Sequence, residues 1–527
     1  MGTIYTGVAS AWKVPGVYVN VQLGRGVPSA AGSPRRVLIV GSKLNEADPI
    51  IAAENEVLFE LNPRTGNHEP LKADGAICAV ESLSNAGKYF GYGSELYTMA
   101  KAAFAANAST NLWAYVISEP AGGTRASSQT IAIANATEDD TIKVSCLGEQ
   151  ISVPVSEGDT AVDIATDIAD VFNARLKHLP YLCYADAGTL SFRAKHLGAI
   201  WNGALAQGAG GLERIGVQVT IQSSTGGVVF DANAVTIGYG TGSTVGAGEH
   251  QIDFEELKRQ RFHYVVMPCD SDGTTHILTS GLTSYLADQA DPKVGLRQQA
   301  VFGSTAALNV VSGLTHPDDG VSDPRIQCVW AKGNSYTPGQ LAAAVAAVRA
   351  AEEEVDPAVN LCRKRLRGVP MTSDDNLVNL VSQNAAISDG ITPLVPFQGD
   401  MVILRSVTCS ANRPVAPVLD TGKVTVSDFV ADDIELKMLT SYTGFKLSPD
   451  TDAPLPSNVV TPSAVRLSIL NWLRRLEAKG IITRVTELSE KVRVEIDPDV
   501  DGRINFEIPE DVVDILAVAA GNLIQVG

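Results

Sequence analysis

The sequence has few features of a secreted or membrane-embedded protein. No stretch of its 527 residues approaches the roughly 18 consecutive apolar residues that a membrane-spanning helix needs. The most apolar tail, Asp514 to Val526, is shorter than that and carries Asn522 and Gln525. The N-terminal MGTIYTGVASAWKVPG lacks the basic start and the apolar block of a secretory signal. We therefore expect neither membrane insertion nor secretion.

Positive charge is also scarce. The chain has 41 Lys and Arg against 59 Asp and Glu, and its formal net charge is −18. Because binding to a phosphate backbone requires a basic surface, DNA or RNA is not expected as a direct partner. An acidic chain is suited to docking on a basic face of another protein. With 45% hydrophobic residues, the chain can bury cores in about three or four domains of roughly 150 residues each.

The cysteines form no pattern that would bind a metal or build a disulfide framework. They are odd in number and dispersed, without a CxxC spacing, which favours a reduced, cytosolic protein. We expect them to behave as small buried hydrophobic residues. The seven are Cys78, Cys146, Cys183, Cys269, Cys328, Cys362 and Cys409.

Local motifs for catalysis and metal binding are missing too. The seven histidines show no HExxH spacing, and the sequence has no GxSxG nucleophile motif. The glycine-rich stretch Gly238–Gly248 has no GK[ST] nearby and no helical pattern directly after it. We therefore expect a flexible hinge there, not a phosphate-binding loop.

Asp270 and Asp272 are the remaining candidates for chemistry. They follow an apolar strand, where α/β enzymes often place catalytic groups. A calcium-binding loop that starts at Asp270 would need Glu at position 281, which is Gly281. We prefer an Asp-capped helix start. We predict no catalytic residue, no metal and no cofactor.

Continuous apolar runs that alternate with helical patterns predict a largely parallel α/β sheet covered by helices. The expected strands are 36–41, 112–117, 263–268, 300–303 and 326–330, and the expected helices are 94–106 and 276–289.

Between residues 117 and 263 Gly, Ser and Thr become frequent and alternating strands appear. This change predicts a small β-rich domain inserted into the α/β core. Its expected strands are 130–133, 141–144, 150–153 and 189–192, and one amphipathic helix is expected at 160–173.

Two further helices, at 339–354 and 463–479, are marked by Thr-Pro starts, and the second stops before Gly480. The second helix has one apolar face, formed by Val465, Ile469, Trp472, Leu473 and Leu476. It also carries a basic patch, formed by Arg466, Arg474, Arg475 and Lys479. A separate basic run, Arg363–Arg367, is either a solvated loop or a docking patch for an acidic partner.

A lone strand is expected at each end of the chain. A β-rich run follows Pro15 and is flanked by loop, and a β-prone piece ends the sequence. Because isolated strands are unstable in water, each must pair at a distance or with another chain. The residues expected to pair in this way are Gly16, Val17, Tyr18, Val19, Asn20, Val21, Leu523, Ile524, Gln525 and Val526.

Several of these motifs follow one another in an order typical of one family. They are the segments 14–19, 35–41, 334–339, 366–370, 389–392, 401–405 and 460–480, with 152–153, 158–161 and 194–198 in the inserted part. Together they cover most of the chain and resemble the tail sheath proteins of Mu-like contractile phages.

The resemblance implies a structural protein, not an enzyme. Such subunits polymerise as stacked hexameric rings around an inner tail tube and contract to drive the tube through the host cell envelope for genome delivery. The implied partners are further copies of the chain, the tail tube protein, and the baseplate and tail terminator proteins. The implied place is the virion tail, assembled in the host bacterial cytoplasm.

The resemblance also implies roles for the marked residues. The terminal strands would be exchanged between subunits, each adding to a sheet of a neighbour. The basic patch Arg466, Arg474, Arg475 and Lys479 would face an acidic tube through weak contacts that can break in sequence.

The expected fold is multidomain α/β: a mixed core sheet covered by helices, with an inserted β-rich domain and a C-terminal α+β domain bearing exchangeable terminal strands. The expected division is an N-terminal arm at 1–30, a discontinuous core at 31–120 and 250–405, an outward-facing insertion at 121–249, a tube-proximal C-terminal domain at 406–515 and a C-terminal arm at 516–527. Two alternatives stay open. One is an α/β hydrolase-like or nucleotide-dependent enzyme with a β-rich insertion, and the other is a surface adhesion module.

Overall fold

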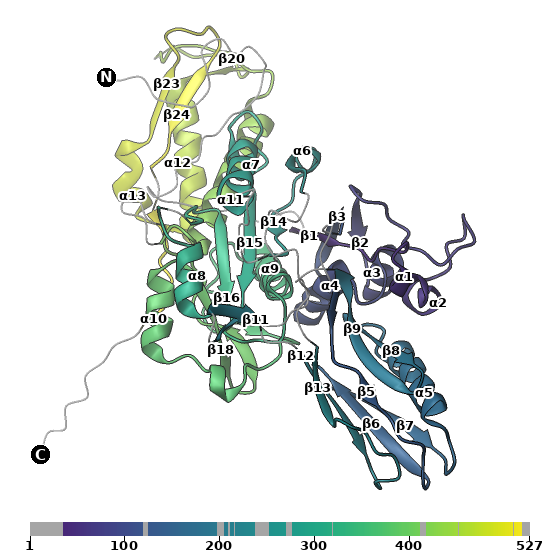
Figure 1. Ribbon diagram of the computed structural model, residues 1–527. Helices are drawn as coiled ribbons and strands as arrows, with labels where there is room; N and C mark the ends of the chain where they lie inside the picture. The colour runs from purple at the N-terminus through teal and green to yellow at the C-terminus, as the bar shows by residue number, and fades with distance from the viewer. Residues whose placement is uncertain are drawn as a thin grey trace, which may run out of the picture.

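Figure 1 presents a computed structural model of the chain. The structure describes residues 35–119, 125–197, 205–208, 211–214, 217–237, 252–269, 277–318, 320–411, 418–451, 453–509 and 511–518. Three of the predicted features lie outside these residues: the two terminal strands, the glycine-rich Gly238–Gly248, and the pair Asp270 and Asp272.

The core is a nine-stranded sheet in the order β17-β19-β18-β16-β15-β14-β1-β3-β2. Neighbouring strands from β18 to β3 run parallel, and β17, β19 and β2 are antiparallel additions at the two edges. The predicted parallel sheet is therefore confirmed. Strands β2, β17 and β18 were not expected, and β19 corresponds to the predicted segment 401–405. The bounds are β17 Arg365–Leu366, β19 Asp400–Ile403, β18 Ile391–Phe397, β16 Ile326–Trp330, β15 Gln299–Ser304, β14 Tyr264–Val266, β1 Arg36–Ser42, β3 Asn111–Ile117 and β2 Ile77–Val80.

Two capped helices cover one face of this sheet. The side chains of Ser94 and Thr337 accept backbone N–H groups at the starts of α4 (Glu95–Ala106) and α9 (Pro338–Val355). Both helices bury small alanine side chains against each other and against the sheet. Gly303 of β15 lets the start of α9 lie directly against the sheet, because a Cβ there would lie 2.2 Å from the carbonyl oxygen of Pro338. Both helices were predicted.

Shorter helices complete the core. The predicted helix at 276–289 is a π-helical turn, Ile277–Gly281, that continues as α7, Leu282–Ala290. The remaining helices of the described core are α1 Pro49–Ala52, α2 Asn55–Leu58, α3 Leu83–Phe90, α6 Phe254–Leu257, α8 Leu308–Leu314, a 3₁₀ turn Asp374–Asn376 and α10 Leu380–Ser388.

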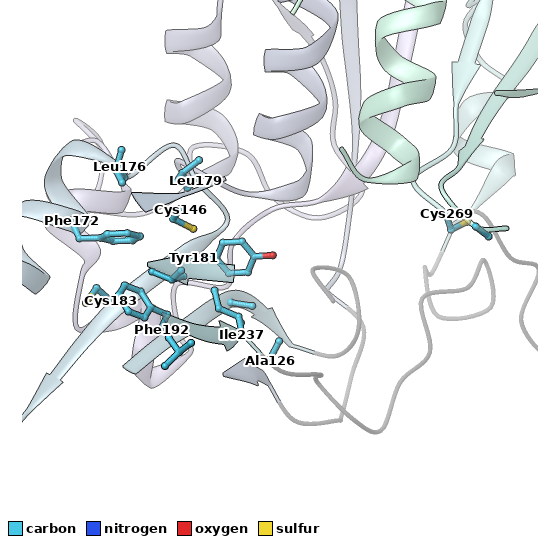
Figure 2. Packing of buried hydrophobic residues seen from close by; sticks show 14 of the residues in the cluster. Ala126, Cys146, Phe172, Leu176, Leu179, Tyr181, Cys183, Phe192, Ile237 and Cys269 are labelled. Atoms are coloured by element: carbon cyan, nitrogen blue, oxygen red, sulfur yellow. The ribbon is translucent and has the colours of Figure 1, made fainter. Parts of the chain in front are cut away.

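The inserted part is β-rich, as predicted, and carries the expected helix α5 (Ala161–Arg175). It forms a sheet in the order β13-β12-β6-β7, a second sheet in which β9 pairs with β4, β5 and β8, and the hairpin β10-β11. Figure 2 shows the aromatic and cysteine side chains that fill its interior. The strands are β4 Arg125–Ser127, β5 Ile131–Ala132, β6 Asp140–Cys146, β7 Glu149–Val155, β8 Tyr181–Asp186, β9 Thr189–Leu197, β10 Leu205–Gly208, β11 Gly211–Arg214, β12 Val217–Ser223 and β13 Ala234–Ile237.

The C-terminal part is built on two helices, α11 (Thr421–Tyr442) and α12 (Pro462–Ala478). Helix α12 was predicted, whereas α11 was missed. In Figure 1 this yellow part and the blue inserted part lie on opposite sides of the core sheet. The other elements are α13 Val485–Leu488, a 3₁₀ turn Ser489–Lys491, β20 Lys446–Leu447, β21 Val459–Val460, β22 Ile482–Thr483, β23 Arg493–Ile496, β24 Ile504–Glu507 and β25 Asp511–Val512.

The structure is therefore a mixed α/β fold with several sheets. Six of the seven cysteines are buried free thiols, as expected, whereas Cys362 is only half-buried. The division of the chain into five parts at the stated boundaries stays a prediction.

Candidate assembly surfaces

Helix α12 combines a buried apolar face with an exposed basic face. The Thr461 hydroxyl accepts the N–H of Ala464 at 3.3 Å, and Pro462 occupies the first turn. The helix ends at Ala478, and Gly480, two residues beyond, has a φ of +72° that suits glycine. The predicted apolar face is buried: Val465, Ile469, Trp472, Leu473 and Leu476. Burial of each of these side chains contributes about 1.5–3 kcal/mol, which fixes the orientation of the helix.

The four predicted basic residues of α12 fall into two groups. The guanidinium of Arg466 is half-buried and donates to the carbonyl oxygens of Val492 at 2.9 Å and Ser489 at 2.7 Å. These two hydrogen bonds hold α12 against the turn before β23 and use two of the five guanidinium N–H donors. Arg474, Arg475 and Lys479 are exposed. Within the described part of the chain, none of these three forms an ion pair.

The hairpin β23–β24 beside α12 is a candidate acceptor for further strands. It pairs Arg493 with Glu507 through to Ile496 with Ile504, and it packs on α12. Strands β22 and β25 form a second two-stranded sheet. Among the described residues neither sheet has a third strand, so both keep unpaired strand edges. Such edges are templates for pairing with another chain.

Helix α11 joins this C-terminal part to the amino ends of the core strands through buried ion pairs. Arg325, just before β16, binds Asp428 of α11 through two hydrogen bonds of 2.7 and 2.8 Å. Arg297, just before β15, pairs with Asp432 at 3.0 Å and Glu435 at 2.6 Å. Because each charge has a partner, the network avoids the large penalty of an unpaired buried charge.

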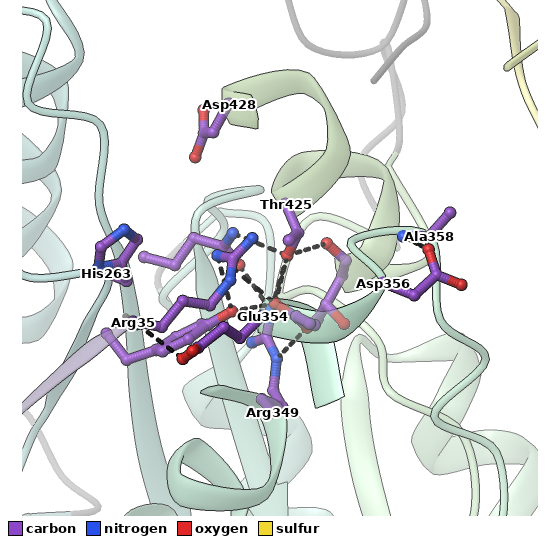
Figure 3. Close-up of polar contacts among 12 residues, drawn as sticks. Arg35, His263, Arg349, Glu354, Asp356, Ala358, Thr425 and Asp428 are labelled. Atoms are coloured by element: carbon purple, nitrogen blue, oxygen red, sulfur yellow. Dashed lines mark hydrogen bonds and ion pairs between the residues drawn. The ribbon is translucent and has the colours of Figure 1, made fainter. Parts of the chain in front are cut away.

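A second polar cluster includes Arg349 and Thr425, which Figure 3 shows together with Asp428 of the first network. Arg349 of α9 is fully buried; it donates to Glu353 at 2.9 Å and to Gln299 and Gln327 at 2.8 Å. The hydroxyls of Tyr264 and Thr425 also donate to Glu353. Burial and the neighbouring Glu353 carboxylate raise the pKa of Tyr264 well above its usual range. The cluster connects α9, α11 and the sheet.

His263 lies at the edge of these networks and is held neutral. Its Nδ1 accepts the backbone N–H of Arg36 at 3.1 Å. Burial, and then the charges of Arg261, Arg35 and Arg36, lower the pKa of His263 to about 2.

The joint between the inserted part and the core is also polar and buried. The Glu95 carboxylate accepts the N–H and hydroxyl of Ser42 at 2.8 and 2.9 Å. The Nε2 of His196 accepts the N–H of Glu95 at 3.1 Å, and its Nδ1 contacts the Glu119 carboxylate at 3.2 Å. Burial alone would raise the pKa of Glu119, but the hydrogen bonds from His196 and from the N–H of Leu197 lower it.

The hydrogen-bonded residues Ser42, Glu95 and His196 lie at the carboxyl end of β1, where α/β enzymes often place catalytic groups. Ser42, Glu95 and His196 are all buried, so they face no solvent from which a substrate could enter. Their hydrogen bonds hold the insertion against the core. Sequence reasoning missed the cluster because its members are up to 154 positions apart and share no local motif.

The basic run Arg363–Arg367 is largely neutralised within the chain. Lys364 pairs with Glu352 at 2.6 Å and Arg365 with Asp400 at 3.3 Å. The guanidinium of Arg363 stacks over the ring of Phe397. These contacts favour the interpretation of the run as a solvated loop over that of a docking patch for an acidic partner.

Metal-binding clusters and membrane-spanning helices are both absent from the described residues. In that part of the chain no three His, Cys, Asp or Glu side chains gather in a metal-binding cluster. No described helix is long and apolar enough to cross a membrane.

Comparison with known proteins gives a full-length match. The chain is 21% identical, over 532 aligned residues, to the Mu-like prophage FluMu tail sheath protein of Haemophilus influenzae, and the alignment covers 99% of both proteins. The chain is thus similar over its whole length to a tail sheath protein of a Mu-like prophage. This confirms the resemblance, and the open alternatives of an enzyme or an adhesion module find no support in the matches. No family model matches the chain.

Solved structures of sheath proteins are also similar to it. The sheath tail protein of Desulfitobacterium hafniense aligns over 95% of this chain and 97% of its own, with 12% identity and a TM-score of 0.45. The contracted helical sheath of the anti-feeding prophage aligns over 98% and 99%, with 12% identity and a TM-score of 0.45. Because both TM-scores are below 0.5, the similarity to tail sheath proteins rests on the full-length sequence match.

Proposed function

We propose that the chain is the structural subunit of a contractile tail sheath. It polymerises as stacked hexameric rings around an inner tail tube and contracts to drive the tube through the host cell envelope for genome delivery. The observation that carries this proposal is the match to a tail sheath protein over 99% of both chains. The role is mechanical, with no enzymatic step.

The partners follow from this role. The chain binds further copies of itself, the tail tube protein, and the baseplate and tail terminator proteins, without direct contact to nucleic acid or insertion into a membrane. Its place is the virion tail, assembled in the cytoplasm of the host bacterium. The net charge of −18 supports protein partners over nucleic acid.

The terminal strands Gly16–Val21 and Leu523–Val526 are exchanged between subunits. The two-stranded sheets β23–β24 and β22–β25 have unpaired edges among the described residues, which makes them suitable acceptors. Added strands form backbone hydrogen bonds that depend little on side chains. Such links hold subunits together while their other contacts change.

The exposed Arg474, Arg475 and Lys479 of α12 face the tube. Exposed ion pairs are individually worth about 0–1 kcal/mol, so each contact can break as contraction passes along the tail. Arg466, the fourth predicted residue, is half-buried and directs two of its donors to Ser489 and Val492, so its share in this contact is smaller.

Co-sedimentation with purified tail tubes tests the tube contact. The double variant Arg474→Glu/Arg475→Glu is expected to reduce tube-bound sheath at least tenfold, because it replaces attraction with repulsion. Arg175→Glu, which reverses an exposed charge on the inserted part, is the matched control and should bind normally. Equal binding by the double variant and the control would refute the tube contact, and failure of the unmodified chain to assemble on tubes would refute the proposed function.

A further inference from the structure

Helix α11 and the core are separated by a cleft of about 260 Å³. Phe429, Asp433 and Leu436 line the α11 side, and Arg35 and Glu354 line the core side. Leu436 is 60% exposed, although it stands beside buried side chains of the same helix. An open cleft with an exposed leucine at its wall is a surface that another segment can cover.

The charges in this cleft are not balanced. Its arginines are paired: Arg261 with Asp432 at 2.5 Å, and Arg297 with Asp432 and Glu435. Two carboxylates of the cleft, in contrast, have a hydrogen-bond donor but no ion pair among the described residues. Glu354 accepts the backbone N–H of Arg35 at 3.1 Å, and Asp433 accepts the indole N–H of Trp472.

Neither Glu354 nor Asp433 forms an ion pair with any described residue. The cleft therefore offers negative charge next to an apolar side chain.

The N-terminal segment has complementary chemistry and is attached at this place. Residues 1–34 contain Lys13 and Arg25 and no Asp or Glu, in a chain with a net charge of −18. They join the described chain at Arg35, which is itself part of the cleft wall. Arg25 is ten positions away, and ten residues can span up to about 35 Å, so its side chain can reach either carboxylate.

We propose that residues 22–34 of the same chain occupy this cleft. Arg25 lies beside Glu354 and Asp433, and Leu23 and Val27 cover Leu436. The complementary charges and the attachment of the segment at Arg35 support occupancy of the cleft independently of the proposed function. Its consequence for assembly rests on the proposed function: the base of the N-terminal arm is tethered to α11, and only residues 1–21 extend to a neighbouring subunit.

Disulfide trapping in the full-length chain at micromolar concentration tests this directly. In a Cys362→Ser background, which removes the half-buried native thiol, Val27→Cys/Leu436→Cys should form an intramolecular disulfide in most molecules under mild oxidation. The control pair Val27→Cys/Leu467→Cys places the second thiol on α12, where Leu467 is 58% exposed. That pair should cross-link at least fivefold less.

Equal yields in the two pairs, no disulfide, or disulfides only between chains would overturn the proposal. Hydrogen exchange gives a second measurement. Removal of residues 1–21 should leave exchange in α11 unchanged, whereas removal of residues 1–33 should accelerate it several-fold around Phe429–Leu436. Equal exchange in the two truncated chains would contradict the proposal. Because these measurements use unassembled protein, their failure is distinguishable from a failure to form sheaths.

Discussion

Arg325 and Asp428 face each other across the joint between the core sheet and α11, linked by two hydrogen bonds of 2.7 and 2.8 Å. Both side chains are at least 90% buried. A bidentate guanidinium–carboxylate pair fixes the relative orientation of the two side chains as well as their distance. The pair therefore couples the position of the C-terminal part to that of the core.

Removal of one partner of this pair should be costly. Asp428→Ala leaves the Arg325 guanidinium buried without its carboxylate, and we expect a loss of about 3–5 kcal/mol in the free energy of unfolding. Thermal unfolding and hydrogen exchange of α11 measure the effect. Glu256→Ala, which breaks the exposed pair with Arg259, is the control and should cost below about 1 kcal/mol. Similar losses in the two variants would contradict the assigned role of the buried pair.

His263 should make the fold sensitive to acid. Burial and three nearby arginines lower its folded pKa to about 2, whereas the unfolded chain takes up the proton near pH 6.5. Stability is therefore complete above about pH 6.5 and falls below it, by up to about 1.4 kcal/mol per pH unit.

His263→Asn retains an acceptor for the Arg36 N–H and should flatten the pH dependence of the unfolding midpoint between pH 6.5 and 5. The exposed His316 is the control, and His316→Asn should leave the slope unchanged. An unchanged slope in His263→Asn would show that another group is responsible.

Asp140 should hold together one end of the inserted part. Burial alone would raise its pKa, but the Ser223 hydroxyl and the N–H groups of Thr225, Thr141 and Ser224 lower it well below the usual range. Its contribution is therefore present above about pH 3.9 and is lost as the pH falls further.

Asp140→Asn removes an acceptor for these donors at neutral pH, with an expected loss of about 2 kcal/mol. Faster hydrogen exchange at residues 223–228 is the readout. Asp139→Asn, at an exposed acceptor for one N–H, should change little. Unchanged protection at 223–228 in Asp140→Asn would remove this role from Asp140.

Gly303 should tolerate no side chain. A Cβ there would lie 2.2 Å from the Pro338 carbonyl oxygen, so Gly303→Ala must displace α9 from the sheet. We expect a loss of about 1–3 kcal/mol in unfolding free energy. Gly313 in α8 has no atom within 4 Å of an added Cβ, so Gly313→Ala should be neutral or slightly stabilising. A neutral Gly303→Ala would mean that α9 packs less tightly than described.

Much of the fold could be predicted because local pattern and burial agree. The apolar run Val37–Val40 and the capped helices after Thr337 and Thr461 each carry a strong local signal. Helix α11 does not. Its first turns, with Val424, Thr425 and Val426, are rich in β-branched residues that favour strands. Tertiary packing and the carboxylate pairs with the core arginines determine its conformation instead.

The candidate surfaces were less predictable. The spacing on α12 located Arg474, Arg475 and Lys479 on an exposed face, but it could not show that Arg466 turns back to the carbonyl oxygens of Ser489 and Val492. That contact depends on a chain segment more than 20 residues away. The cleft beside Arg35 is likewise formed by distant elements and has no sequence signature.

The central claim is that this chain assembles with itself through exchanged terminal strands. Electron microscopy of the purified chain, beside a truncated chain that lacks Leu523–Gly527, tests it most directly. We predict long hollow tubes from the intact chain and their loss on truncation, because the removed residues would add a strand to a neighbouring subunit. Compact monomers from both proteins would contradict the account, and tubes from both would exclude the C-terminal strand as the link.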